Sequence, residues 1–314
     1  MNRPMTPDKS AHPEKAVSPP PLLFEMIRSF VTLARTLNLS HAVKDLGSTR
    51  QTVRRHIATL EETMGAPLFA VDDRRYQLTP AGEKALPNAK DILARGTTWL
   101  RGQASSVGTL QYLRAHHGEW DFYQQQQPLG RIWTDQSILL RETFRAWAMS
   151  SGEIENPSFS HVRPYLIIYR QSDAGWICVE FGEKSVYVNW FGLDYARSSV
   201  GRPISRMPAG EEFSHLIDQA FHEVEATQTA RLDYVFTRMP RIEKDVLSPV
   251  AYQRLILCGY FPDGSPAVMS LIAPLENVDL IGVDPMQTIS LDPVAMAPFD
   301  PAGAIFEQLS AVKE

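Results

Sequence analysis

Arginine, glutamine and threonine gather between Thr49 and Arg55, where their side chains could bind the phosphates and base edges of DNA. The sequence there is TRQTVRR, and the next acidic residue is Glu61. A guanidinium can donate to O6 and N7 of guanine, and a glutamine amide can pair with adenine. Arg50 and Arg54 are like charges four residues apart, and cations near a helix N-terminus oppose its dipole. We therefore expect this stretch to bind an anion, although a solvated basic face is the ordinary alternative.

The same stretch has an apolar side at helical spacing. Four residues fall within about one quadrant of a helix from Thr49 to Met64 and are expected to face a core: Val53, Ile57, Leu60 and Met64. The residues expected to contact DNA lie at its N-terminal end, on the opposite side or on the flanks: Thr49, Arg50, Gln51, Thr52, Arg54 and Arg55.

The neighbouring pattern predicts the helices that hold this stretch. A first helix is expected from Leu22, with one apolar face made by Leu23, Ile27, Phe30, Ala34 and Leu37. Ser40 is expected to cap a second, short helix that ends at Gly47, and Thr49 to cap the third, which Gly65 ends. Two short helices joined by a tight glycine-containing turn form a helix-turn-helix unit.

A small hairpin and a long helix should follow. The segment from Asp72 to Leu78 is expected to be extended and to form a wing, on which Arg74 and Arg75 grip the DNA backbone. Thr79-Pro80 predicts the start of a helix that runs to about Gln103. Its apolar stripe is Leu86, Ala89, Leu93 and Leu100, and Pro87 interrupts it one turn in.

The stretch from Leu39 to Gly82 resembles the winged helix-turn-helix of LysR-type transcriptional regulators. The matching residues, in order, are Ala42, Leu46, Ile57, Leu60-Glu61, Gly65, Leu68-Phe69, Arg74, Leu78-Thr79 and Gly82. The resemblance runs from Leu22 to about Ile92. It implies a sequence-specific regulator that binds double-stranded DNA as a homodimer, paired through the helix after the wing, and it leaves a tetramer open.

Some residues depart from that family's pattern. The family usually has glutamine and proline where Arg50 and Gln51 stand, serine where Arg54 stands, and arginine where Val71 stands. These positions are expected to meet DNA, so the preferred sequence should be atypical. An interaction protein whose helix-turn-helix no longer reads DNA is the alternative of another class.

The charge is divided unevenly along the chain. Residues 1–103 carry 15 Lys and Arg against 10 Asp and Glu, and residues 104–314 carry 16 against 26, which gives the net charge of −5 over 314 residues. A basic first third is typical of a nucleic-acid-binding head on a different kind of body.

The body should be an α+β domain with an antiparallel sheet, because extended runs follow one another with few helices between them. Helices are expected at Ser137–Met149 and at 210–228, and strands at 165–170, 175–181, 185–191, 231–239, 251–261 and 266–275, the last two joined by a hairpin turn.

This order of elements resembles a PAS sensory domain, in which residues 188–208 leave the second strand and cross the ligand pocket. That resemblance implies a small-molecule effector or a protein partner, with a degenerate binding-protein-type effector domain as the alternative.

The expected organisation is a disordered tail (1–20), the winged helix-turn-helix (21–80), a linker and dimerisation helix (81–104), a helical connecting region (105–160), the PAS-like domain (161–275) and a C-terminal extension (276–314). We expect no enzymatic activity, cofactor or metal, since nucleotide-binding and nucleophile motifs are missing. Buried thiols are expected at Cys178 and Cys258. Two cysteines and the absence of an apolar run of about 18 residues favour the cytoplasm.

Overall fold

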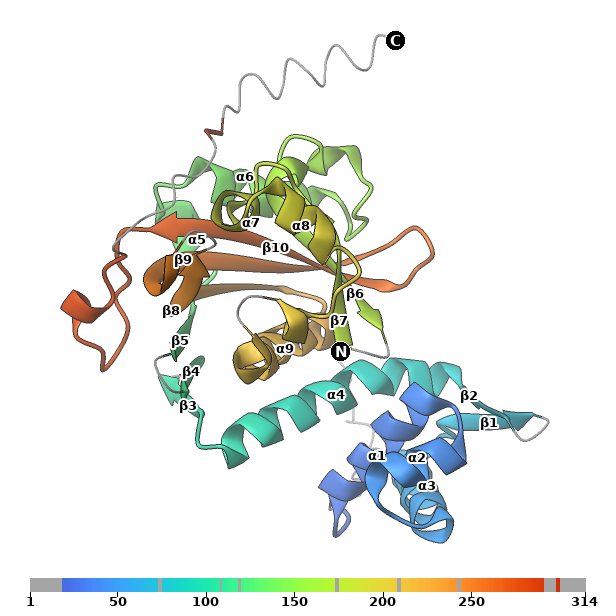
Figure 1. Ribbon diagram of the computed structural model, residues 1–314. Coiled ribbons are helices and arrows are strands. Elements are labelled where there is room, and N and C mark those ends of the chain that lie inside the picture. The colour runs from blue at the N-terminus through green and yellow to red at the C-terminus, as the bar shows by residue number, and fades with distance from the viewer. Residues whose placement is uncertain are drawn as a thin grey trace, which may run out of the picture. The chain divides into compact units, whose positions relative to one another are not determined.

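The structure is a computed structural model, which describes residues 19–72, 75–107, 109–117, 120–172, 175–207, 210–241, 244–290 and 298–299. The chain divides between Leu86 and Pro87 into two compact units (Figure 1). Almost all of the expected N-terminal tail, and residues 291–297 and 300–314 of the expected extension, lie outside the described residues.

The first unit is a three-helix bundle followed by a two-stranded hairpin. Its elements are α1 (Leu23–Thr36), α2 (Leu39–Leu46), α3 (Arg50–Met64), β1 (Phe69–Asp72), β2 (Arg75–Leu78) and the start of α4 (Pro80–Leu100). The predicted helix-turn-helix and wing are thus both present. Phe30, Leu33, Ala42 and Val53 form the centre of the bundle, each with at most 1% of its surface exposed.

The helix ends confirm some of the sequence expectations and correct others. Thr49 caps α3, and Gly65 ends it in the left-handed conformation, as predicted. Asn38, and not Ser40, caps α2, because its side chain accepts from the N–H groups of Ser40 and His41. Two residues expected in the core are largely exposed, since Leu37 lies beyond the end of α1 and Met64 in the last turn of α3.

The start of α4 lies close to the residue that precedes the wing. Thr79 Oγ1 accepts from Gly82 N at 3.0 Å, so Thr79 caps this helix and Pro80 takes its first position. A Cβ on Gly82 would stand 2.2 Å from the carbonyl oxygen of Leu68. This close approach explains why a glycine stands here.

The second unit is built on an eight-stranded antiparallel sheet of order β3-β4-β5-β8-β9-β10-β6-β7. Its strands are β3 (Ala104–Val107), β4 (Leu110–His117), β5 (Trp120–Gln127), β6 (Leu166–Ser172), β7 (Gly175–Phe181), β8 (Ala230–Arg241), β9 (Lys244–Tyr260) and β10 (Pro266–Leu275). Its helices are α5 (Arg131–Thr134), α6 (Ile138–Met149), α7 (Val186–Phe191), α8 (Leu193–Ser199) and α9 (Gly210–Thr227), with short 3₁₀ turns η1 (Pro157–Phe159), η2 (Arg163–Tyr165), η3 (Ile204–Arg206) and η4 (Pro285–Gln287).

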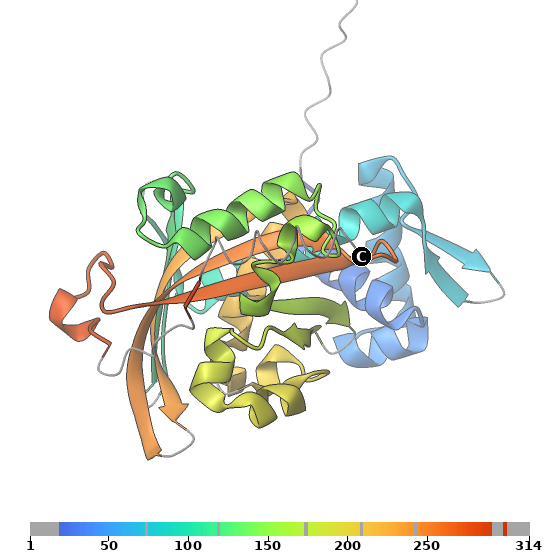
Figure 2. The same cartoon turned by 90° about the horizontal axis from the view of Figure 1, so that it is seen from above.

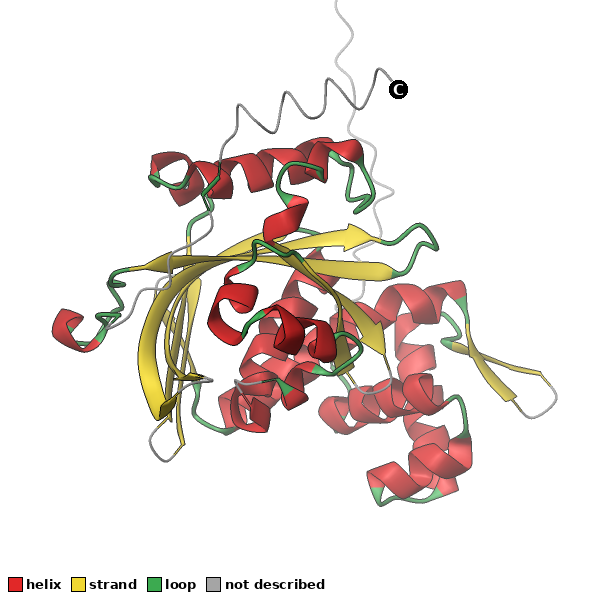
Figure 3. Cartoon of the chain, turned by 45° about the horizontal axis from the view of Figure 1, so that its top comes forward, coloured by secondary structure: helices red, strands yellow, loops and turns green. Residues whose placement is uncertain are grey.

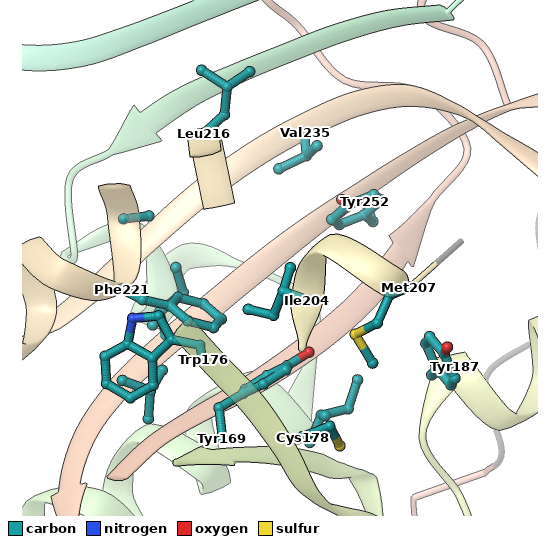
Figure 4. Close-up of a cluster of buried hydrophobic side chains, with 14 of the residues drawn as sticks. Tyr169, Trp176, Cys178, Tyr187, Ile204, Met207, Leu216, Phe221, Val235 and Tyr252 are labelled. Carbon is teal, nitrogen blue, oxygen red and sulfur yellow. The ribbon is translucent and has the colours of Figure 1, made fainter. Parts of the chain in front are cut away.

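Helices cover both faces of this sheet (Figures 2 and 3). On one face α7, α8 and α9 pack over the strands, and side chains such as Trp176, Tyr187, Phe221 and Tyr252 fill the core between them (Figure 4). On the other face α5 and α6 bury Ile132, Leu139 and Leu140 against the same strands. The expected antiparallel α+β body is therefore confirmed.

The prediction of a helical connecting region from 105 to 160 is wrong for its first part. Residues 104–127 form β3, β4 and β5, and β5 pairs with β8 through Phe122↔Thr237 to Gln127↔Leu232. The glutamine run that suggested a linker is part of β5. Gln124 is fully buried, and its Oε1 accepts from Arg254 Nη2 at 2.6 Å.

One predicted strand is a helix. Residues 186–191 form α7, whose buried residues Val186, Tyr187, Trp190 and Phe191 recur at helical spacing. The segment is rich in β-branched and aromatic residues, which favour strands, but burial of one helical side decides its structure. The other predicted strands, both predicted helices and the hairpin turn at 261–265 are confirmed.

Candidate nucleic-acid interface

The N-terminus of α3 is fixed by two threonines. Thr49 Oγ1 accepts from Thr52 N at 3.1 Å, and the two hydroxyl oxygens are 2.9 Å apart. The Thr49 hydroxyl therefore caps the helix and also hydrogen bonds the Thr52 hydroxyl. These two residues define the position of the neighbouring side chains.

The four polar residues between and beyond these threonines are exposed. Arg50, Gln51, Arg54 and Arg55 all reach solvent, whereas the core side of the helix is made by Val53, His56, Ile57 and Leu60. Among the described residues, no carboxylate lies within 4 Å of these three guanidinium groups. The structure thus brings together the six residues of α3 and its cap that were predicted to contact DNA, on a surface with unpaired positive charge.

Arg50 has a contact that the sequence reasoning missed. Its Nη2 donates to Ser40 Oγ of α2 at 2.8 Å. Ser40 was expected to be a cap, and the ten-residue separation across the turn gives no local signal for the pair. Arg50 is therefore directed toward α2.

Glu61 holds the hairpin against α3. Its Oε1 accepts from the N–H groups of Leu68 and Phe69, at 2.7 and 3.1 Å. Phe69 begins β1, and its ring packs edge-on against Phe30 and Tyr76. A single carboxylate on α3 therefore positions the wing.

The wing itself is described only in part. Arg75 begins β2, lies opposite Asp72 in the strand register of the hairpin, and is exposed. Arg74 and Asp73 lie outside the described residues. Val71, at the position where the family usually has arginine, is 61% exposed.

A buried histidine joins two helices of the bundle. His56 Nδ1 lies 2.8 Å from Ser29 Oγ of α1, and both side chains are buried. This pair is another residue set that the sequence reasoning missed, because the two residues are 27 positions apart. It fixes α3 on α1 and so orients the exposed side of α3.

The sheet unit has a surface hollow beside β7. Its volume is about 410 Å³, and it is lined by Ser160, Arg163, Pro164, Glu180, Phe181, Gly182, Glu183 and Lys184. Arg163 is already paired with Glu180 and Glu155, and the hydrogen bond to Glu180 is the main cause that raises its pKa above the ordinary value. The hollow therefore identifies no ligand class.

Both cysteine thiols of the sheet unit lie in its core. Cys178 and Cys258 are free and buried, as predicted, and burial raises the pKa of Cys258 to about 12.

Within the described residues, no three His, Cys, Asp or Glu side chains gather as metal ligands would. In the same part of the chain, no helix has the length and apolar character that crossing a membrane requires.

A winged helix-turn-helix with an unpaired basic recognition helix defines a DNA-binding domain. Residues 24–83 match the family model described as bacterial regulatory helix-turn-helix protein, lysR family. Residues 24–83 are therefore a LysR-family helix-turn-helix domain, which confirms the expectation for the head. The match does not extend to the sheet unit.

Individual curated relatives match a part of the chain as well. The chain is 30% identical over 125 residues to the HTH-type transcriptional regulator HdfR of Yersinia enterocolitica, covering 38% of this chain and 40% of that one. For HdfR of Yersinia pestis the identity is 30% over 103 residues, 32% of this chain and 34% of that one. This chain thus spans about a third to two fifths of the curated relatives it matches.

Solved structures overlap the chain over a similar share. OxyR of Corynebacterium glutamicum in its oxidized form is 29% identical over 27% of this chain and 26% of its own, with a TM-score of 0.25. The crystal structure of a CbnR_DBD–DNA complex is 29% identical over 25% of this chain and 92% of its own, with a TM-score of 0.24. Both overlaps leave about three quarters of this chain unmatched.

Proposed function

We propose that this chain is a sequence-specific transcriptional regulator of the LysR type, which inserts α3 into the major groove of DNA. The proposal rests on the three arginines in the N-terminal part of α3. Arg50, Arg54 and Arg55 are exposed, and among the described residues no carboxylate lies within 4 Å of them. They belong to a LysR-family helix-turn-helix domain. Relatives that match about a third of the chain are named transcriptional regulators, which supports the same function.

Each predicted residue has a role in this proposal. Thr49 and Thr52 set the helix end, Gln51 and Arg55 face away from the core, and Arg54 stands on the flank nearer the wing. Arg74 and Arg75 would hold the DNA backbone, so the affinity should fall as the salt concentration rises.

We propose a homodimer paired through α4. The predicted stripe is used inside the chain instead, since Ala89 is buried and Leu86 and Leu93 are half-buried. Leu100, the last residue of that stripe, is 70% exposed, and so are two large apolar side chains outside it, Ile92 at 47% and Trp99 at 70%. These side chains are the ones that a second copy of α4 would cover.

The sheet unit is proposed to be a PAS-like input domain. Five of its strands lie in the order β8-β9-β10-β6-β7, and α7 to α9 lie between the second and third of these strands along the chain. In the sequence resemblance to PAS domains, residues 188–208 leave the second strand, and this segment lies in the same interval of the chain. Strands β3 to β5 extend this unit beyond that resemblance.

A route from the input domain to the head is provided by α4. Arg95 of α4 lies 3.2 Å from Glu223 of α9, and Glu223 also accepts from the buried Arg231 of β8. Lys90 Nζ donates to Gln171 of β6. A bound effector would act by changing these contacts, because any effect on DNA requires different affinities in two states.

The test is selection of the full-length protein on a random duplex library, followed by sequencing. The expected result is an inverted repeat whose half-sites are about one helical turn apart, or a multiple of it. The Arg54→Ala and Arg55→Ala variants should bind more weakly and with a smaller salt dependence. No enrichment by the folded wild-type protein, with both variants indistinguishable from it in affinity and salt dependence, would favour the interaction protein instead.

A further inference from the structure

Arg50 stands apart from the other exposed polar residues of α3. With about 100° of rotation per residue, Gln51 and Arg55 lie opposite the buried side of the helix, while Arg50 lies about a third of a turn away from them. All three side chains are exposed. Gln51 and Arg55 therefore share one outward direction, and Arg50 has another.

A hydrogen bond fixes that second direction. The Arg50 guanidinium donates to Ser40 Oγ of α2 at 2.8 Å, and Ser40 is itself held, since its backbone N–H donates to Asn38 Oδ1 at 2.9 Å. The preceding residue Thr49 is fixed by its bond to Thr52 N. Both ends of the Arg50–Ser40 contact are thus anchored in capped helices.

In a helix-turn-helix complex the second helix enters the major groove, and the first crosses the DNA backbone. A guanidinium turned from α3 toward α2 is therefore directed at the backbone and away from the base edges. Arginine at a phosphate contributes charge and register, but it carries no sequence information.

We propose that Arg50 is a phosphate-binding residue positioned by Ser40, and that Gln51 and Arg55 alone among these three residues read bases. This division rests on the proposed function, since it presupposes that α3 enters the groove. It assigns to Ser40 a positioning role at the protein–DNA interface and removes Arg50 from the residues that set the preferred sequence.

The experiment compares Ser40→Ala, Ser40→Thr, Arg50→Ala, the Ser40→Ala/Arg50→Ala double variant and Arg55→Ala in the full-length protein. Each variant is put through duplex selection and through binding titrations at several salt concentrations. Arg50→Ala should enrich the wild-type motif, weaken binding to all sequences alike and reduce the salt slope by about 1. Arg55→Ala should also bind more weakly, but unlike Arg50→Ala it should lose the preference at one position of each half-site.

Ser40→Ala should weaken binding roughly two- to tenfold, the range for one lost hydrogen bond, without changing the motif. Ser40→Thr retains the hydroxyl and should bind as the wild type does. In the Arg50→Ala background, Ser40→Ala should have no further effect, because its role passes through Arg50. Equal thermal stabilities of the variants exclude a merely structural cause.

The outcomes separate this inference from the proposed function. A changed base preference in Arg50→Ala would overturn it, and so would additive losses in the double variant. If the wild type enriches no motif, the proposed function fails, yet the Ser40 and Arg50 variants can still be compared in their salt-dependent binding to one duplex. Equal salt slopes for the wild type and Arg50→Ala in that comparison would refute the phosphate contact as well.

Discussion

Asp218 of α9 is the carboxyl group with the clearest change in acidity. Burial raises its pKa from 3.8 to about 6, and the nearby His222 opposes this increase. The charged form is thus disfavoured in the folded protein. Because the folded-state pKa is above the unfolded one, this group lowers the stability progressively as the pH rises from about 4 to about 6.

The Asp218→Asn substitution should remove this effect. We expect the free energy of unfolding of the variant to exceed that of the wild type by up to about 3 kcal/mol at pH 7.5, since each pKa unit is worth about 1.4 kcal/mol. The difference should shrink toward zero near pH 4. Urea unfolding at a series of pH values measures it, and a difference that is the same at every pH would contradict the explanation.

Glu61 shows how one side chain can position an element. Its carboxylate accepts from two backbone N–H groups at the start of β1. The Glu61→Ala variant should lose about 1.5–3 kcal/mol of stability, as expected for hydrogen bonds to a charged group. Glu62→Ala, at an exposed neighbouring position, is the matched control and should change the stability by less than about 0.5 kcal/mol. Equal urea midpoints for the two variants would show that the wing does not depend on Glu61.

At the scale of elements, the contact between α4 and the chain before the wing is set by the absence of a side chain. Thr79 N donates to the Leu68 carbonyl at 3.0 Å, and Gly82 leaves no room for a Cβ beside the same oxygen. The helix, the hairpin and the end of α3 are thereby held at close range within the head.

The Gly82→Ala variant should force this contact apart. A Cβ at 2.2 Å from the Leu68 oxygen and 2.9 Å from Leu78 Cδ2 must displace backbone, which should cost about 1–3 kcal/mol. Gly130→Ala is the control, because Gly130 has ordinary helical dihedrals and nothing within 4 Å of a Cβ. Thermal unfolding of both variants tests this, and a Gly82→Ala transition as high as that of the control would refute the close contact.

At the scale of the whole molecule, the two units have different chemical characters. The head carries unpaired arginines on α3, whereas the sheet unit encloses a buried ion pair. Arg231 is 1% exposed and Asp233 is fully buried, and the two form an ion pair with a separation of 2.8 Å. The helix α4 belongs to both units and exposes apolar side chains that a monomer would leave in water.

Assembly through α4 can be tested with the Ile92→Glu/Trp99→Ser double variant. If the proposed dimer forms through α4, this variant should sediment as a monomer and the wild type as a dimer in analytical ultracentrifugation, because a buried charge and a lost aromatic contact both oppose pairing. Met149→Ser, at a position of α6 that is also 70% exposed, is the control and should remain dimeric. A double variant with the sedimentation of the wild type would exclude this face of α4.

The sequence alone determined the features that depend on neighbouring residues. The caps at Thr49 and Thr79, the left-handed glycine at Gly65 and the hairpin turn at 261–265 follow from local hydrogen bonds and local dihedral preferences. The periodicity of α3 separated most of its buried residues from its exposed arginines for the same reason, although it misplaced the last-turn Met64 and missed the buried His56.

Tertiary structure decided what depends on residues far apart in the chain. Gln124 became part of a buried strand because Arg254, 130 positions away, supplies its hydrogen bond. Residues 186–191 became helical because the core covers one helical side of the segment, against its strand propensity. Ser40 came to hold Arg50 only when the turn brought α2 and α3 together. Pairing partners that lie far apart in the chain are set only in the folded protein, and no local pattern encodes them.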